Sequence, residues 1–192
     1  MREKKAKPYH HGDLREEVLR LALAALEKEA PEKLTLRELA RQAGVSSMAL
    51  YRHFADREAL LSALAGVGVD DLGERMRVVN QTRNAKEGLT AIGVVYVRFA
   101  VERPGLFQLM YGGKPPKTPS KPGEAPHAAY AALTRRISEL AKPAQRDTAF
   151  LACWSLVHGL ATLLVTDRIR KPITDPAAVA EQIIRFFAGA FD

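Results

Sequence analysis

The chain has 192 residues, of which 47% are hydrophobic and 27% charged, a composition typical of folded globular proteins and unlike disordered or fibrous ones. A single cysteine, Cys153, excludes an intramolecular disulfide framework and an all-cysteine zinc site. The net charge of +7 is spread along the chain, so it favours a polyanionic partner only weakly. The basic first residues precede no apolar stretch, and no apolar run approaches the roughly 20 residues that cross a bilayer. We therefore expect a soluble, cytoplasmic protein.

Helical periodicity is present along the whole chain and strand patterns are nearly absent, so the sequence predicts an all-α fold of about nine helices. In the first part of the chain, helices are expected at about residues 13–30, 35–44, 46–53 and 57–79. Asp13, Thr35 and Asp56 are suitable N-caps, and Glu38 completes a capping-box pattern with Thr35.

The rest of the chain predicts five further helices. They are expected to begin near residues 85, 104, 127, 143 and 176, and the eighth to run to about Arg170. Between the sixth and seventh, residues 112–126 contain five prolines and three glycines, which predicts a loop. In the long fourth helix, Gly66, Gly68 and Gly73 each weaken the helix by up to about 1 kcal/mol relative to alanine, which leaves open a bend.

Residues 34–54 combine two short helices with a tight turn at Gly44. Glycine takes a left-handed conformation at a helix end without steric cost, and Ala40 is small where the second helix must cross closely. The apolar residues that can form a shared face between the two helices are Leu36, Leu39, Val45, Leu50 and Phe54. This pattern is typical of a helix-turn-helix.

The opposite face of the second of these helices is unusual for a plain bundle. It exposes Ser46, Ser47, Met48, Ala49, Tyr51, Arg52 and His53. Small residues at its start let the backbone approach base edges, and hydroxyls, arginine and ring tips at its flanks can reach phosphates. Free N–H groups at the helix starts after Thr35 and Asp56 can also face phosphate. The alternative is a helical bundle without DNA affinity.

Four linked segments resemble the DNA-binding domain of the TetR family of bacterial transcriptional regulators. They are residues 35–40 (Thr-Leu-Arg-Glu-Leu-Ala), 43–46 (Ala-Gly-Val-Ser), 49–54 (Ala-Leu-Tyr-Arg-His-Phe) and 56–61 (Asp-Arg-Glu-Ala-Leu-Leu). The resemblance implies that Tyr51 and His53 contact phosphates, and that Arg57 replaces a phosphate-binding lysine. It also implies that residues 46–49 face the major groove. Met48 offers no hydrogen bonds, so readout would lean on apolar contact with thymine methyl groups.

The complete predicted DNA-binding set is Thr35, Arg37, Ser46, Ser47, Met48, Ala49, Tyr51, Arg52, His53 and Arg57. For Arg37 and Arg41 the alternative is a solvated surface role. Lys4, Lys5 and Lys7 form either a free tail or an arm that reaches the minor groove.

The C-terminal part resembles a subgroup of TetR regulators named after a Trp-His-Gly signature, the WHG-domain regulators, at residues 154–159 and 99–112. Trp154 and His158 are one helical turn apart and share a face. They either line an effector pocket or pack in the core, where His158 would bond a backbone carbonyl, and Gly159 would let a neighbouring helix approach closely. The predicted ligand-binding set, with the same alternative of core packing, is Tyr96, Phe99, Phe107, Met110, Tyr111, Trp154 and His158.

The sequence thus predicts a helix-turn-helix domain at residues 1–56 and a larger effector-binding and dimerisation domain at residues 57–192. We expect a homodimer through the last two helices that binds a palindromic DNA operator and, as a repressor, is released by a small, largely apolar effector. The apolar residues expected at the dimer face are Phe150, Leu156, Leu163, Val179, Ile183, Phe186 and Phe187. Activation, or a ligand-binding dimer without DNA binding, is the alternative.

No cofactor, metal or catalytic site is expected. His10 and His11 are adjacent and so do not share a helix face, and only Asp13 could join them. Cys153 lies in apolar company and is expected to be an inert buried thiol, since only His158 is near it in sequence and the spacing is not helical. An enzyme would need a convergent acid, base or nucleophile set, and none can be assembled.

Overall fold

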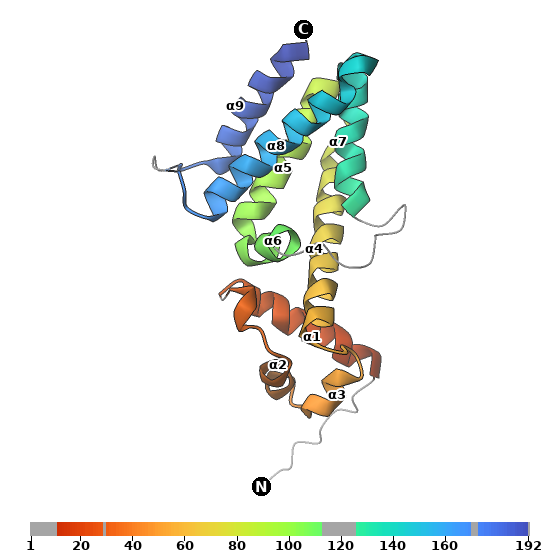
Figure 1. The fold of residues 1–192 in the computed structure, drawn as a ribbon, viewed down its shortest axis with the longest axis vertical. Coiled ribbons are helices and arrows are strands. Elements are labelled where there is room, and N and C mark those ends of the chain that lie inside the picture. Colours follow the sequence, from red (N-terminus) through yellow and green to blue (C-terminus); the bar gives the residue numbers. More distant parts are fainter. Residues whose placement is uncertain (1–10, 29, 113–125, 170–172, 192) are drawn as a thin grey trace.

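The computed structural model describes residues 11–28, 30–112, 126–169 and 173–191, with the side chains at 11–13 and 126–128 left aside. These residues form nine α-helices and three short 3₁₀ turns and contain no strand, which confirms the expected all-α fold (Figure 1). The α-helices are α1 (His11–Leu26), α2 (Leu36–Gln42), α3 (Ser47–Tyr51), α4 (Arg57–Val79), α5 (Ala85–Glu102), α6 (Pro104–Tyr111), α7 (Pro126–Leu140), α8 (Arg146–Val165) and α9 (Pro176–Ala188). The 3₁₀ turns are η1 (Pro31–Lys33), η2 (Pro143–Gln145) and η3 (Gly189–Phe191).

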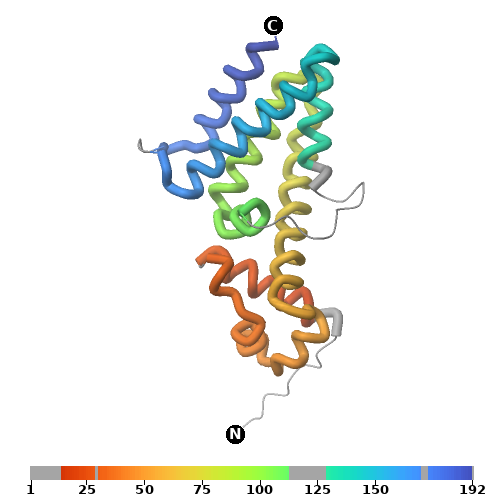
Figure 2. The backbone as a smooth tube through the Cα atoms, in the orientation of Figure 1, coloured from red at the N-terminus to blue at the C-terminus, as the bar shows by residue number. Residues whose placement is uncertain are grey.

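The helices gather at two ends of an elongated molecule, and α4 runs from one to the other (Figure 2). Helices α1, α2 and α3 lie around the start of α4, and α5 to α9 form the larger bundle. Helix α5 is the centre of that bundle because α4, α6, α7, α8 and α9 all pack against it. This explains why Leu89, Ile92, Tyr96 and Phe99 of α5 are all buried.

The N-terminal part is held by an apolar core to which each of its helices contributes. Val18 of α1, Leu39 of α2, Leu50 of α3 and Leu60 of α4 are all buried. The turn between α2 and α3 forms as expected, since Gly44 has a φ of 69° in the left-handed region. Across this turn the Val45 amide donates to the Ala40 carbonyl at 3.0 Å and the Gly44 amide to the Arg41 carbonyl at 3.2 Å.

Four expected helix boundaries are wrong. Helix α1 begins at His11, so Asp13 lies inside the helix and is not its N-cap, and α1 ends at Leu26, short of the expected end near Pro31. Helix α8 begins only after the turn η2 and ends at Val165, five residues before Arg170. Its end is closed by Asp167 in the left-handed region at a φ of 51°, with the Arg168 amide donating to the Leu163 carbonyl at 2.9 Å. Helix α4 is a single helix that continues through its three glycines.

The predicted loop at 112–126 and the lysines near the N-terminus lie almost wholly outside the described residues. In the part of the chain that is described, one helical segment, Pro143–Val165, is long and apolar enough to cross a membrane by length and composition alone. Its buried side chains, among them Cys153 and Val157, belong to the same core as α5.

Candidate nucleic-acid interface and effector site

Helix α3 presents the residues that were expected to face the major groove. The Ser46 hydroxyl caps it by accepting from the Ala49 amide at 3.3 Å, and the completely buried Leu50 anchors it in the core. On the other side, Met48 is 70% exposed and Tyr51 is 52% exposed. Both side chains are therefore free to contact a partner of this helix.

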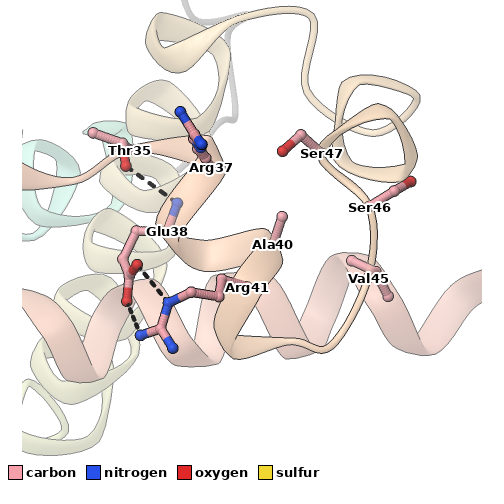
Figure 3. Close-up of a pocket in the computed structure, with 8 residues that line it drawn as sticks. All are labelled: Thr35, Arg37, Glu38, Ala40, Arg41, Val45, Ser46 and Ser47. Carbon is pink, nitrogen blue, oxygen red and sulfur yellow. Dashed lines mark hydrogen bonds and ion pairs between the residues drawn. The ribbon is translucent and has the colours of Figure 1, made fainter.

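An open groove of about 530 Å³ lies between α2 and α3 (Figure 3). Of the predicted DNA-binding set, Thr35, Arg37, Ser46 and Ser47 line it. The Thr35 hydroxyl caps α2 by accepting from the Glu38 amide at 3.2 Å. The groove therefore brings together hydroxyls and two guanidinium groups, which typically bind phosphate, with the carboxylate of Glu38, which pairs with Arg41.

The two arginines of α2 differ in their partners. Arg41 donates to the Glu38 carboxylate at 2.6 and 2.9 Å, and this hydrogen bonding lowers the pKa of Glu38 to about 2. The carboxylate is thus turned to Arg41 and Gln42, so only the Thr35 half of the expected capping box forms. Arg37 has no ion-pair partner among the described residues and extends separately from the pair (Figure 3). The charge of Arg41 is compensated within the protein, whereas that of Arg37 is available.

The remaining predicted phosphate contacts lie just after α3. Arg52 is exposed at the C-terminal end of α3, and His53 beside it is half-buried. Arg57, the first residue of α4, is engaged within the protein. Its Nε donates to the Leu34 carbonyl at 2.8 Å and its Nη2 to the Pro31 carbonyl at 2.6 Å. This pair of bonds could not be predicted from residue types, because both acceptors are backbone carbonyls, 23 and 26 residues away in the chain.

Five of the seven predicted ligand-binding residues form one cluster of rings, which we call the ring cluster: Tyr96 of α5, Phe107 and Tyr111 of α6, and Trp154 and His158 of α8. The Trp154 and His158 rings are stacked, with centroids 5.7 Å apart and planes within 5°. The Tyr96 hydroxyl lies 2.8 Å from His158 Nδ1. His158 is therefore bonded to a side chain of another helix and not to a backbone carbonyl as the packing alternative expected.

Burial favours the uncharged form of each titratable group in the ring cluster. It raises the pKa of the Tyr96 and Tyr111 hydroxyls and lowers the pKa of His158. Two phenols and a neutral imidazole thus remain as hydrogen-bonding groups among apolar ring faces. Cys153 is buried beside this region, and burial raises its thiol pKa to about 12, as expected for an inert thiol.

Two predicted ligand-binding residues lie apart from the ring cluster. The Phe99 ring is fully buried, with the Arg75 guanidinium 5.4 Å from its centroid. Met110 packs on α4, where a Cβ at Gly68 would lie 2.6 Å from its Sδ. Arg75, which sequence reasoning did not single out, also pairs with Asp71 and Glu102 at 2.8 Å each.

The surface formed by α8 and α9 is apolar. Phe186 is 87% exposed and borders a hollow of about 580 Å³ whose lining is mostly apolar and includes Leu156 and Phe187. Among the described residues, no other helix comes within 4 Å of the position that a Cβ would take at Gly159 on α8, so the expected close helix neighbour is not found there. Phe150, expected here, instead lies 4.3 Å from the Tyr130 ring of α7. Within the described ranges, no group of three or more histidines, cysteines or carboxylates could hold a metal ion.

Two family models match the chain. The one described as "Bacterial regulatory proteins, tetR family" matches residues 18–64, and "Tetracyclin repressor-like, C-terminal domain" matches residues 89–187, half of the chain. The chain belongs to the TetR family. The first match covers the helix-turn-helix, and the second covers the ring cluster and the apolar surface of α8 and α9.

Relatives of this TetR-family regulator agree with the assignment. An uncharacterized HTH-type transcriptional regulator of Mycobacterium tuberculosis is 26% identical over 180 residues, which are 91% of this chain and 80% of the relative. The nucleoid occlusion factor SlmA of Idiomarina loihiensis is 32% identical over 99 residues. The chain spans about half the length of SlmA. A solved structure of a Rhodococcus sp. RHA1 protein of unknown function matches with a TM-score of 0.75 at 31% identity, and the match covers 97% of both chains.

Proposed function

We propose that this TetR-family regulator binds a palindromic DNA operator as a homodimer and is a cytoplasmic repressor that a small effector releases. The observation that carries the proposal is the short helix α3, which is anchored by Leu50 and turns Met48 and Tyr51 to solvent. One helix of this length reads few base pairs. Two copies about a two-fold axis would reach successive major grooves about 34 Å apart.

The proposed contacts divide into two kinds. Ser46, Ser47, Met48 and Ala49 would face base edges, while Thr35, Arg37, Tyr51, Arg52 and His53 would reach phosphates. We propose the division of the chain at residue 56 because the DNA-facing residues precede α4, whose first turn still contributes Leu60 to the N-terminal core.

The apolar surface of α8 and α9 is the proposed dimer interface. Phe186 and the hollow beside it are too exposed for an isolated chain, and a second copy would bury both. Gly159, which has open space around it, leaves room for a partner helix. An interface between identical copies would supply the two-fold axis that a palindrome requires.

The ring cluster is the proposed effector site, and by its residues we also assign the C-terminal part to the WHG-domain subgroup. Because its groups are neutral, the site favours an uncharged effector with flat apolar surface. His158 and the two tyrosines would supply one or two hydrogen bonds to a carbonyl or hydroxyl oxygen. A ligand that fits one arrangement of the dimer better would shift it away from DNA.

A gel-shift measurement with the promoter DNA next to the protein's own gene tests the DNA-binding proposal. We expect tight, salt-sensitive binding. Tyr51→Ala should weaken it, whereas Tyr130→Ala should not, although both tyrosines are 52% exposed. The proposal fails if the two variants bind equally well, or if neither this promoter nor a genomic library yields a bound fragment.

A further inference from the structure

The two hydrogen bonds of Arg57 close the base of the helix-turn-helix. The acceptors, the carbonyls of Pro31 and Leu34, lie just before α2 begins, and both residues are buried. All of α2 and α3 lies in the chain between Leu34 and Arg57. The guanidinium therefore links the first turn of α4 to the residues just before α2. We call this pair of hydrogen bonds the joint; it closes the segment that carries α2 and α3.

The joint depends on the shape of the arginine side chain. The Pro31 carbonyl already accepts from the Leu34 amide at 3.2 Å, and Arg57 adds a second, shorter bond to it. The planar guanidinium donates to two acceptors in a fixed fork, which a lysine ammonium on its flexible stem does not reproduce. The α1–α2 connection is also packed against α6, so it is fixed from the side of the bundle as well.

We propose that Arg57 is a positioning residue for DNA binding, acting through the protein's own backbone and not by contacting a phosphate. The fork sets how α2 and α3 sit on α4, and hence where α3 points. The buried residues Leu36, Leu50 and Leu60 hold the segment together without it. Loss of the fork should therefore loosen the placement of α3 while the domain stays folded. The inference rests on the proposed function, since it assumes that α3 reads DNA.

The test compares Arg57→Ala, Arg57→Lys and the control Arg52→Ala on the same operator fragment over a range of salt. We expect both Arg57 variants to bind about tenfold more weakly, since a pair of charge-assisted bonds is lost. Their slope of log affinity against log salt should equal that of the unsubstituted protein. Arg52→Ala should instead lower the slope by about 0.9, the loss expected for one phosphate contact.

Two other outcomes would overturn the inference. If Arg57→Lys binds like the unsubstituted protein and Arg57→Ala lowers the slope by about 0.9, Arg57 is a phosphate contact. If both variants lower the melting temperature but the folded protein binds unchanged, the fork serves stability alone.

A second measurement is independent of DNA, so it distinguishes this inference from the proposed function. Amide hydrogen exchange over residues 34–54 should be faster in both Arg57 variants than in the unsubstituted protein, and unchanged in Arg52→Ala. If amide exchange is unchanged in Arg57→Lys, the claim that the Arg57 bonds fix the placement of α2 and α3 is wrong, even if no operator is ever found. If exchange is faster but the protein binds no DNA, the proposed function is wrong and the positioning role of Arg57 stands.

Discussion

Arg136 is buried at a junction of three segments, and its removal should be the most damaging single change among the arginines described. It is 1% exposed. Its Nε donates to Asn80 Oδ1 at 2.6 Å, its Nη2 to the Asn80 and Thr82 carbonyls at 2.8 Å each, and its Nη1 to Glu139 at 2.9 Å. A Cβ at Gly88 would lie 2.3 Å from Arg136 Nε, so the guanidinium fills the space beside α5 completely. The side chain thus joins α7 to the end of α4 and to the turn before α5.

The expected cost follows from these bonds. Arg136→Ala leaves the Asn80 and Thr82 oxygens without their donor, and each acceptor that stays buried costs about 1–3 kcal/mol. Breaking a buried charged arrangement from one side typically costs about 3–5 kcal/mol in total. In a chain of this length each kcal/mol lowers the melting temperature by about 2–4 °C, so we expect a fall of about 6–20 °C.

Arg135 provides the matched control. It pairs with the same Glu139 at 3.1 Å, but its side chain is 64% exposed. Exposed pairs contribute about 0–1 kcal/mol, so Arg135→Ala should barely change the free energy of unfolding. Urea denaturation followed by circular dichroism measures both variants. The reasoning is wrong if Arg136→Ala costs less than about 1 kcal/mol, or if the two variants cost the same.

Phe186→Glu should weaken the dimer by more than about 100-fold, because each of two copies loses roughly 1.5–3 kcal/mol of apolar burial. Light scattering measures this, and Val78→Glu, which is also at an exposed apolar residue, should leave the mass unchanged. Replacing thymine by uracil in the operator should weaken binding if Met48 reads methyl groups, and Met48→Ala should remove that difference; equal loss in both proteins would contradict it. Burial lowers the pKa of His158, so the unfolded state takes up a proton first as pH falls through 6.5. The melting temperature should therefore fall between pH 7 and 5, and His158→Phe should flatten that fall; an unchanged profile would count against it.

Four helix starts could be predicted because a side-chain cap is a local structure, whereas α1 and α8 begin elsewhere than expected. Thr35, Asp56, Asn84 and Asp175 each accept bonds from amides two or three residues ahead, so the residue type and its position carry the information. The end of a helix is harder to predict when the glycine that usually follows it is absent. Gly44 marked its turn correctly, but α8 ends at a left-handed aspartate, which no sequence rule distinguishes from an ordinary surface residue.

The same contrast holds for the candidate site. The helix-turn-helix is contained in about 20 successive residues, so its motif could be read directly. The hydrogen bond between Tyr96 and His158 joins residues that are 62 positions apart in the chain. Phe99 lies close to Tyr96 on α5, but its ring packs under the Arg75 guanidinium and not in the ring cluster. Arg57 and Arg136 bind backbone carbonyls, and since every residue has one, residue types could not reveal these partners.

Helix α6 gives the proposed effector release a physical route. It contributes Phe107 and Tyr111 to the ring cluster, so a ligand that enters between the rings has to displace side chains of this helix. At its other end Gly105 meets α1 so closely that a Cβ there would lie 2.3 Å from the Leu26 carbonyl oxygen. Because this contact has no room even for a methyl group, a movement of α6 would push α1 and would not be taken up by a gap between the two helices. Because α1 packs on α2 and on α4, a shift of α6 would reach the segment that holds α3.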